Sequence, residues 1–269
     1  MDKVSACIII YNEEKNIEEC LKRIQFCVDE IILVHDGNCQ DKSLQIAKKY
    51  TNKIFIQERK GFCEAHYAFA FSQAKHNWIL KLDADELLSK KLQKNLKKII
   101  SSGQASRYLF LWTEYNKDKS KIHKNTNYYK PFLFYKPDMI SVGILHFPII
   151  SKGISIKLNY HVYHLSRPLK VSLKKIKKWS KLHAKQLITE NYSSFQGNKN
   201  NYNLRPRHYL FIKYPLMLGP IRALTIIIRI TFNQRLCLKN MHKSFKTILG
   251  EFIYNILLAK EIHKQKRNQ

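Results

Sequence analysis

Short apolar runs alternate with amphipathic segments through the first hundred residues, and this alternation constrains the fold more than any other feature. Asn16 and Glu19 have the spacing of a capping box at the start of the first amphipathic segment. Ser89 is expected to cap a later helix that Gly103 closes. Strands alternating with helices predict an α/β domain with a mostly parallel sheet flanked by helices. The apolar runs predicted to be its buried strands are residues 4–10, 30–34, 53–57 and 78–82.

The pattern changes beyond residue 105. Short β-like runs occur there, at 108–112, 132–135, 140–145 and 155–165. From Pro168 onward the chain is basic and predicted to be mainly helical. We therefore divide it into a domain at 1–165, with halves at about 1–105 and 106–165, and a basic helical region at 166–269.

Polar side chains follow three of the four predicted parallel strands. They are Asn12 and Glu13 after the first, Asp36 and Gly37 after the second, and the run Asp83–Glu86 after the fourth. In open α/β sheets, ligands bind outside the carboxyl ends of the strands. The sequence therefore predicts one binding site at this edge of the sheet.

The triplet Asp83–Ala84–Asp85 is the strongest candidate for a metal site. Alternating side chains put both carboxylates on the same side of an extended segment. Mg²⁺ and Mn²⁺ prefer oxygen ligands, and proteins usually hold Mg²⁺ with one or two carboxylates plus the phosphates of a substrate. A divalent metal of this kind stabilises a departing diphosphate as a Lewis acid. The alternative is an acidic turn that only precedes the helix cap at Ser89.

Asp36 is the candidate ligand for a nucleoside, because its carboxylate could accept a hydrogen bond from a base N–H or a ribose hydroxyl. Gly37 would let the backbone turn tightly or approach a ligand. An ordinary Asp-Gly turn is the alternative. Asn12 and Glu13 could line the same pocket, or they could simply start the following helix.

The net charge of +28, from 48 basic and 20 acidic residues, favours a polyanionic partner. The basic excess grows beyond residue 85, which argues against compositional drift as the whole explanation. A nucleic-acid-binding protein is one possibility. It would be expected to carry a known motif, whereas the stretch NYNLRPRHYLFIKYP has only a basic and aromatic character. We expect no specific nucleic-acid partner.

A second explanation of the charge is an anionic membrane surface. Basic residues flank an apolar stripe near the C-terminus, and RALTIIIRITF at 222–232 is a shorter stretch of the same kind. Such stretches suit a helix lying in a membrane interface, although packing against the rest of the protein is the alternative. No run of about 18 apolar residues occurs, so no transmembrane helix is expected. The stripe consists of Phe245, Ile248, Leu249, Phe252, Ile253, Ile256 and Leu257.

Three ordered motifs carry a resemblance to a known family. They are VSACIIIYNEEKNIEECLKRI, EIILVHDGNCQDKSLQIAKKY and NWILKLDADELLS, and they cover about the first 90 residues. Together they resemble the family 2 glycosyltransferases, and more narrowly the bacterial subgroup that includes lipopolysaccharide-core glucosyltransferases. A weaker similarity continues to about residue 180.

The resemblance implies a GT-A fold, a UDP- or similar nucleotide-linked sugar donor, a divalent metal and inversion at the anomeric carbon. Asp36 falls on the nucleotide-binding aspartate of the family, and Asp83 and Asp85 fall on its metal and diphosphate motif. His164 lies where related enzymes often carry a histidine that helps to hold the metal, and His161 is the neighbouring alternative. Residues 1–105 would bind the donor, and residues 106–165 would bind the acceptor.

Two departures from the family pattern affect the site. His35 stands where the family has the first aspartate of its Asp-Asp-Gly-Ser signature. Phe147 follows His146, where a glutamate often follows the histidine. This second departure leaves open the carboxylate that takes the proton of the acceptor hydroxyl. Candidates for that base are Glu114, which we favour by position, and Asp138, Glu86 and Asp118.

Arg59, Lys60 and His66 are candidates to meet the donor phosphates, or they form part of a solvated surface. Nucleotidyl transfer would predict a glycine-rich phosphate loop near the N-terminus, which the sequence lacks. The sequence therefore predicts a metal-dependent inverting glycosyltransferase that acts on a cell-surface glycan or glycolipid. We expect it in the cytoplasm, peripheral at the inner face of the cell membrane, with reduced cysteines.

Overall fold

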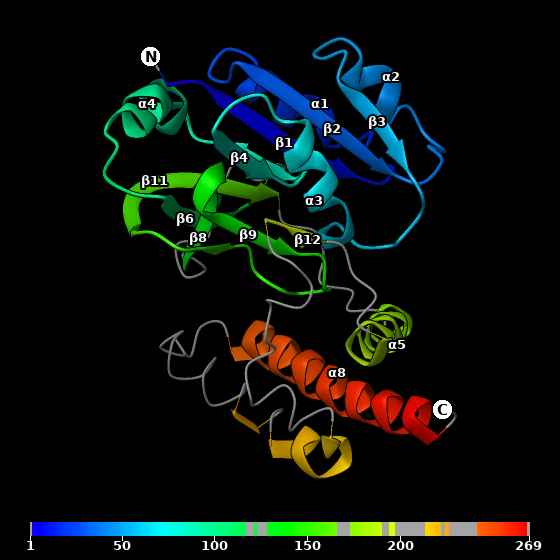
Figure 1. Ribbon diagram of the computed structural model, residues 1–269. Helices are drawn as coiled ribbons and strands as arrows, with labels where there is room; N and C mark the ends of the chain where they lie inside the picture. Colours follow the sequence, from blue (N-terminus) through cyan, green and yellow to red (C-terminus); the bar gives the residue numbers. More distant parts are fainter. Residues whose placement is uncertain are drawn as a thin grey trace. The chain divides into compact units, whose positions relative to one another are not determined.

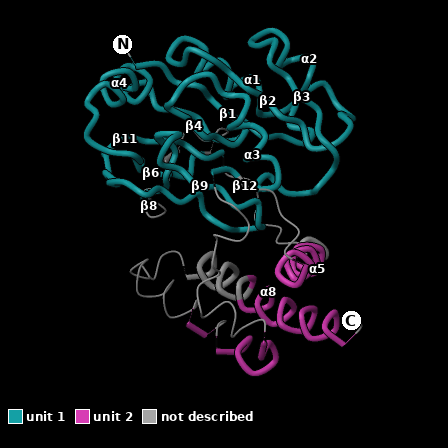
Figure 2. Tube along the Cα trace, in the orientation of Figure 1, with its two compact units in different colours: residues 1–167, 193–198 teal, residues 168–192, 199–269 magenta. Residues whose placement is uncertain are grey.

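The computed structural model forms two compact units (Figure 2). The larger comprises residues 1–167 and 193–198, and the smaller comprises 168–192 and 199–269. The residues that the structure describes are 2–116, 121–122, 128–165, 173–189, 194–196, 213–221, 224–225 and 241–267.

The larger unit is built around one mixed sheet with the order β3–β2–β1–β4–β8–β6–β11–β5, in which β7 also pairs with β6 (Figure 1). The first four strands are parallel, so the predicted α/β fold is confirmed. Further along, β8 is antiparallel to β4 and β6, and β11 is parallel to β6. The strands are β1 (Val4–Ile10), β2 (Glu30–Asp36), β3 (Ile54–Gln57), β4 (Trp78–Leu82), β5 (Glu86–Leu88), β6 (Arg107–Asn116), β7 (Lys121–Ile122), β8 (Tyr128–Tyr135) and β11 (Ser155–Leu165).

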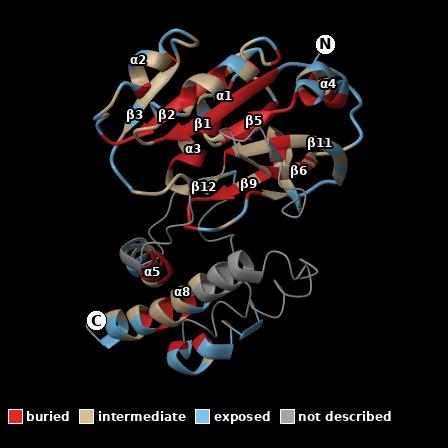
Figure 3. Cartoon of the chain, turned by 180° about the vertical axis from the view of Figure 1, so that it is seen from behind, coloured by how far each residue is buried: buried red, intermediate tan, exposed pale blue. Residues whose placement is uncertain are grey.

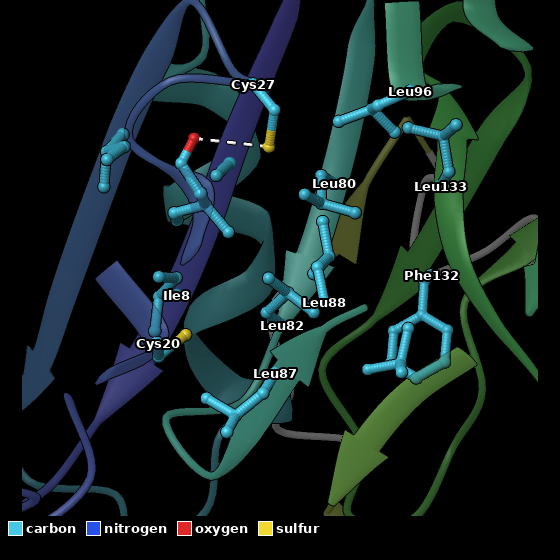
Figure 4. Packing of buried hydrophobic residues seen from close by; sticks show 14 of the residues in the cluster. Ile8, Cys20, Cys27, Leu80, Leu82, Leu87, Leu88, Leu96, Phe132 and Leu133 are labelled. Atoms are coloured by element: carbon cyan, nitrogen blue, oxygen red, sulfur yellow. Dashed lines mark hydrogen bonds between the residues drawn. The ribbon is translucent and has the colours of Figure 1, made fainter. Parts of the chain in front are cut away.

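Helices cover both faces of the parallel half because β1 is apolar on both sides. Ala6 and Ile8 belong to the core beneath α1 (Ile17–Ile24) and α4 (Lys90–Ser101), where Figure 4 shows Ile8, Cys20 and Leu96. The alternate residues Cys7 and Ile9 join a second core under α3 (Glu64–Gln73). A shorter helix, α2 (Ser43–Ala47), lies between β2 and β3 in the chain.

The central strands are buried along their length, as Figure 3 shows for β1 and β2. The apolar interior therefore ends where the strands end, and polar groups collect at that edge. We call the edge at which β1, β2 and β4 end the carboxyl edge.

Two predicted helix caps have different outcomes. The Ser89 hydroxyl accepts a hydrogen bond from the Leu92 amide at 3.3 Å, as predicted. The prediction of a capping box at Asn16 and Glu19 is wrong. The Asn16 side chain instead donates to the Glu13 carboxylate at 2.8 Å, and Glu19 pairs with Arg23.

A small second sheet follows β8 and joins β10 (Ile150–Ser151), β9 (Met139–Val142) and β12 (Ser194–Phe195). A 3-10 turn, Lys136–Asp138, leads into β9. Met139 and Ile149 pack in the core under α3, so this segment crosses the same face of the sheet that α3 covers.

The smaller unit contains the helices α5 (Leu173–Thr189) and α8 (Met241–Arg267), which pack on each other. Ala184 and Leu187 from α5 contact a face of α8 that includes Leu258, Ala259 and Ile262. No helix among the described residues is long and apolar enough to cross a membrane.

The face of α8 that packs on α5 is not the apolar stripe expected from the sequence. Phe252 is 38% exposed, and Ile253, Ile256 and Leu257 are only partly buried, whereas Asn255 is buried. Several other expectations fall outside the described residues: those for Asp118, for most of 201–215 and of 222–232, and for the side chains of Phe245, Ile248 and Leu249.

Candidate active site

The turn Asp83–Glu86 follows β4 at the carboxyl edge and is held from both sides. The Asp83 amide donates to the Glu86 carboxylate at 2.9 Å, and the Glu86 amide donates to the Asp83 carbonyl at 3.0 Å. The Leu165 amide, at the end of β11, donates to the Asp85 carbonyl at 2.8 Å. The two predicted metal-binding aspartates therefore sit on a turn with a fixed backbone.

Two lysines surround the Asp83 carboxylate, whose side chain is 36% exposed. Lys81 Nζ lies 3.3 Å from Oδ1, and Lys130 Nζ lies 3.5 Å from Oδ2. Burial alone would raise the pKa of Asp83, but the two lysines lower it to about 2. The carboxylate is therefore ionised at neutral pH and paired with the two lysines.

His164 lies beside Asp85, as the resemblance implied. Its Nε2 is 3.5 Å from Asp85 Oδ2, and its ring stacks on Trp112 with centroids 4.3 Å apart. Its Nδ1 is buried and has no hydrogen-bond partner. The alternative, His161, is tied to the Thr113 hydroxyl at 2.9 Å. The structure therefore brings His164 to the aspartates.

Two aspartates and a histidine lie at this turn, but they do not form a metal site by themselves. Among the described residues, no group of three or more His, Cys, Asp or Glu side chains could hold a metal ion. Asp83 and Asp85 nevertheless supply two carboxylates, and proteins commonly hold Mg²⁺ with that number plus substrate phosphates. The buried and unpartnered Nδ1 shows that the His164 ring is placed by stacking rather than by a hydrogen bond at that nitrogen.

The carboxylate of Asp36, at the end of β2, accepts hydrogen bonds from donors of the protein itself. Oδ1 accepts from the Lys60 amide at 2.6 Å and from His66 Nε2 at 2.8 Å. Oδ2 accepts from the Gly61 amide at 2.9 Å and lies 3.2 Å from Arg59 Nη1. Burial would raise the pKa of this carboxyl, but the hydrogen bonds from His66 and the two amides lower it below its ordinary value. A nucleoside would have to displace one of these donors to bind the carboxylate.

His35 connects the ends of β1 and β2 through hydrogen bonds, a role that the sequence did not reveal. Its ring is fully buried, its Nδ1 is 2.7 Å from the Gly37 carbonyl, and its Nε2 accepts from the Asn12 amide at 3.3 Å. Because an amide can only donate, Nε2 is the acceptor and Nδ1 carries the proton. Gly37 has φ +94°, and a Cβ there would lie 3.0 Å from the Arg59 side chain, so the turn requires glycine.

Asn12 and Glu13 connect the ends of β1 and β2. The Asn12 side chain accepts from the Gln40 amide at 3.0 Å, and the Glu13 amide donates to the Ser43 hydroxyl at 2.7 Å. The Glu13 carbonyl also accepts from the amide of Ile17, the first residue of α1. Glu13 therefore takes part in the helix start, and the pocket role of Asn12 and Glu13 stays a prediction.

Tyr11 and Arg59 form a stacked pair that the sequence reasoning did not find. The guanidinium carbon lies 3.0 Å from the centre of the Tyr11 ring. A hydrogen bond to the Asp36 carbonyl at 2.9 Å holds Arg59 there. A tyrosine directly before Asn12 at a strand end was the available signal. The pair gives the carboxyl edge an aromatic and cationic surface beside Asp36.

The structure gives the candidate general bases different surroundings. Glu86 is 1% exposed, accepts from Trp112 Nε1 at 2.9 Å and pairs with Lys130, so no acceptor hydroxyl can reach it. Glu114 lies at the carboxyl edge, paired in register with His164. Asp138 is displaced from the site: it follows β8, whose last residue Tyr135 pairs with Trp78 at the opposite end of β4. There it accepts a hydrogen bond from Ser106. The prediction for Asp138 is therefore wrong, because antiparallel β8 carries it away from the site.

The three phosphate candidates also differ. His66 Nε2 is used by Asp36, and Arg59 is stacked on Tyr11. The Lys60 amine pairs with the exposed Glu58 carboxylate at 2.6 Å. Of the three, only the Lys60 side chain has an exposed carboxylate as its partner.

Residues 5–161, more than half of the chain, match the family described as Glycosyl transferase family 2. An uncharacterized glycosyltransferase of Rickettsia felis is 37% identical over 109 residues, which are 40% of this chain and 38% of that protein. The lipopolysaccharide core biosynthesis glycosyltransferase LpsC of Rhizobium meliloti is 27% identical over 104 residues, 37% of each chain. The matched region thus spans less than two fifths of these relatives.

Two solved structures are similar at low sequence identity. The S. aureus TarS 1-349 crystal structure in complex with UDP-GlcNAc has 17% identity and a TM-score of 0.47, covering 98% of this chain and 92% of that one. The Mycobacterium tuberculosis glucosyl-3-phosphoglycerate synthase with Mg²⁺ and UDP has 11% identity and a TM-score of 0.44, covering 70% and 79%. The family match and the α/β sheet with its acidic strand-end turn agree, and the chain belongs to glycosyl transferase family 2.

Proposed function

We propose that the protein catalyses metal-dependent, inverting transfer of a sugar from a UDP-sugar to a cell-surface glycan or glycolipid of the lipopolysaccharide type. The observation that carries the proposal is the turn Asp83–Glu86 at the carboxyl edge, where His164 lies 3.5 Å from Asp85 and two lysines flank Asp83. The chemistry needs this arrangement because a nucleoside diphosphate leaves with negative charge that must be stabilised.

Asp83, Asp85 and His164 would hold the metal, which when bound supplies Lewis-acid stabilisation of the diphosphate. Lys81 and Lys130 place two positive charges beside Asp83, at 3.3 and 3.5 Å. In a partly water-excluded site such charges favour a transition state in which negative charge develops on phosphate oxygens. The turn and the two lysines thus act on the same leaving group.

The ends of β1 and β2 would bind the nucleoside. Tyr11 supplies an aromatic surface, and Arg59 lies 3.0 Å from the centre of its ring. Asp36 supports this wall by holding the amides of Lys60 and Gly61. We therefore assign Asp36 to the nucleoside pocket through the segment that it fixes, with Gly37, Asn12 and Glu13 forming the adjoining backbone.

The proposed acceptor class follows from the similarity to LpsC, whose name assigns it to lipopolysaccharide core biosynthesis. Residues 106–165 would bind the acceptor, because β6 and β11 bring Glu114 and His164 to the carboxyl edge from that half. Residues 166–269 would serve as the membrane-surface region, at the cytoplasmic face of the cell membrane.

The membrane proposal is supported by the face of α8 that α5 leaves uncovered. Phe252 is exposed and Ile256 is partly buried, while Lys260, Lys264 and Lys266 follow on the same helix. Interfacial helices bind through buried apolar area plus attraction to anionic lipid, about 1 kcal/mol for each basic residue near the surface.

A panel of nucleotide sugars tests the proposal. Hydrolysis and thermal stabilisation are measured with and without Mn²⁺ for the wild-type protein and for Asp85→Asn. We expect a UDP-sugar to give both signals, only with Mn²⁺ and only in the wild type. Metal-independent hydrolysis, or equal activity in the variant, would refute the metal-dependent mechanism.

A further inference from the structure

His146 and Phe147 lie between β9 and β10, at the position where the expected glutamate is missing. His146 has φ +62°, an unusual conformation for a residue other than glycine. Its amide donates to Glu64 Oε1 at 3.0 Å. A carboxylate from the start of α3, 82 residues away in sequence, therefore lies against this segment.

Both oxygens of Glu64 are oriented by the protein. The Cys63 thiol donates to Oε2 at 3.4 Å, and its sulfur accepts from the Tyr67 hydroxyl at 3.3 Å. Burial raises the pKa of Cys63 to about 12, so the thiol keeps its proton at neutral pH and remains a donor. Glu64 itself is only partly buried. The carboxylate is thus held in place, with two further lone-pair sites for another donor.

Glu64 lies close to the aspartate turn. The Tyr67 ring centre is 5.6 Å from Lys81 Nζ, which is itself 3.3 Å from Asp83 Oδ1. The charges of Glu64 and Asp83 both act on Tyr67, whose pKa is raised well above its ordinary value mainly by burial. Glu64 is therefore connected to the aspartate turn through Cys63, Tyr67 and Lys81.

We propose that Glu64 is the general base of the transfer. The inference rests on the proposed glycosyl transfer. The hydroxyl of the acceptor gives its proton to the Glu64 carboxylate as its oxygen bonds to the anomeric carbon. The bond from that carbon to the diphosphate oxygen breaks, and its electron pair leaves with the nucleoside diphosphate.

Two carboxylates compete for this role by position. Glu86 is excluded by its burial and its pairing with Lys130. Glu114 lies at the same edge, but it comes from β6 in register with the His164 pair. That register places it next to the residue proposed to hold the metal. Glu64 instead comes from α3, where the His146 amide and the Cys63 thiol orient its carboxylate, which makes it the better candidate.

The test compares Glu64→Gln with Glu114→Gln and with Glu18→Gln as a matched control. Glu18 also lies in the first turn of a helix, and it pairs with Lys22 on α1. Glutamine at 64 keeps an oxygen that can accept from the His146 amide, so a purely structural role predicts little change. Water can replace the acceptor, so the readout is Mn²⁺-dependent hydrolysis of the best UDP-sugar of the panel, together with calorimetric binding of UDP.

We expect Glu64→Gln to lower turnover by about 10²- to 10⁴-fold, the usual contribution of a general base, while UDP affinity stays within about twofold. Glu18→Gln should match the wild type. Turnover of Glu64→Gln within about threefold of the wild type would overturn the assignment, as would a large loss confined to Glu114→Gln. Failure of the proposed function looks different: the wild-type protein itself would bind no UDP and hydrolyse no nucleotide sugar.

Discussion

The ends of β2 and β4 look alike in sequence, since each apolar strand runs into an aspartate, but the structure gives the two aspartates opposite surroundings. The Asp36 side chain is 5% exposed, and four donors of the protein surround its carboxylate. The Asp83 side chain is 36% exposed and has lysine amines 3.3 and 3.5 Å away. One carboxylate is enclosed by four donors of the protein, and the other is partly exposed beside two lysine amines.

The segment after β3 causes this difference. It folds back over the end of β2 and brings the Lys60 and Gly61 amides to Asp36. At the end of β4 the chain turns at once into β5, and the groups that reach Asp83 are the amines of Lys81 and Lys130. A strand-end aspartate is thus a functional candidate only once the donors around it are known.

The largest effect is expected from Asp85→Asn. Replacing this carboxylate removes a proposed metal ligand, and Lewis-acid stabilisation is worth several kcal/mol in the transition state. Turnover with the best UDP-sugar should fall by at least about 100-fold. Near-UV circular dichroism should stay unchanged, because the turn is held by backbone hydrogen bonds. Near-native turnover would remove Asp85 from the site.

Asp36→Ala should produce a different defect. Removing the carboxylate leaves buried donors without an acceptor, which costs about 1–3 kcal/mol each. The segment 59–61 should lose its fixed position, and the affinity for free UDP should fall by about tenfold even without a sugar attached. Calorimetry and urea unfolding measure the two effects. Unchanged UDP affinity would return Asp36 to the role of an ordinary turn residue.

Asp36 should also make the free energy of unfolding depend on pH. Because the pKa of Asp36 is lowered in the folded protein, its contribution is fully present above the unfolded pKa of about 3.9 and is lost as pH falls through the folded pKa. The gap in unfolding free energy between the wild type and Asp36→Asn should therefore be larger at pH 7 than at pH 3. An equal gap at both values would contradict the proposed hydrogen-bond network.

His164→Gln should have a smaller effect than Asp85→Asn. The imidazole lies 3.5 Å from Asp85 and would act as a third ligand, so its loss should weaken Mn²⁺ activation by about tenfold while both carboxylates remain. A Mn²⁺ titration of hydrolysis checks this. The matched substitution His161→Gln, at a residue whose ring is hydrogen-bonded to Thr113, should leave the Mn²⁺ titration unchanged. Identical titrations for the wild type and His164→Gln would exclude ligation.

The smallest effect on catalysis is expected at α8. Replacing Phe252 and Ile256 with serine should weaken co-sedimentation with anionic vesicles and leave turnover on soluble substrates intact. These substitutions are better than deletion of 244–269, which would uncover Ala184 and Leu187 on α5. Binding should also weaken with salt, because the attraction is screened over about 8 Å at physiological ionic strength. Equal sedimentation of both proteins would reject the anchor.

The fold of residues 1–105 could be predicted from the sequence because its signals are local. The four parallel strands have continuous apolar runs, and the Ser89 cap lies directly before its helix. The fold of residues 106–165 could not be predicted as well, since its strands are antiparallel or mixed and their register depends on distant partners. β5, for example, has only three residues and exists because β11 pairs with it.

Site residues were predictable only where the role follows from strand-end position. That rule found the Asp83–Asp85 turn, but it could not show that β8 would carry Asp138 to the other end of the sheet. It also missed Glu64, because its relation to His146 spans 82 residues and depends on the backbone conformation of a loop. Hydrogen bonds that connect distant segments leave no periodic trace in a sequence.

The most direct test of the difference between the two strand ends is calorimetric binding of UDP with and without Mn²⁺ to the wild type, Asp83→Asn and Asp36→Asn. We predict that Mn²⁺ strengthens binding to the wild type and that Asp83→Asn abolishes this dependence. Asp36→Asn should bind UDP more weakly, yet still respond to Mn²⁺. If Asp83→Asn keeps the full metal response, or if the wild type binds UDP equally well without the metal, the β4 turn is not the metal site and the central claim fails.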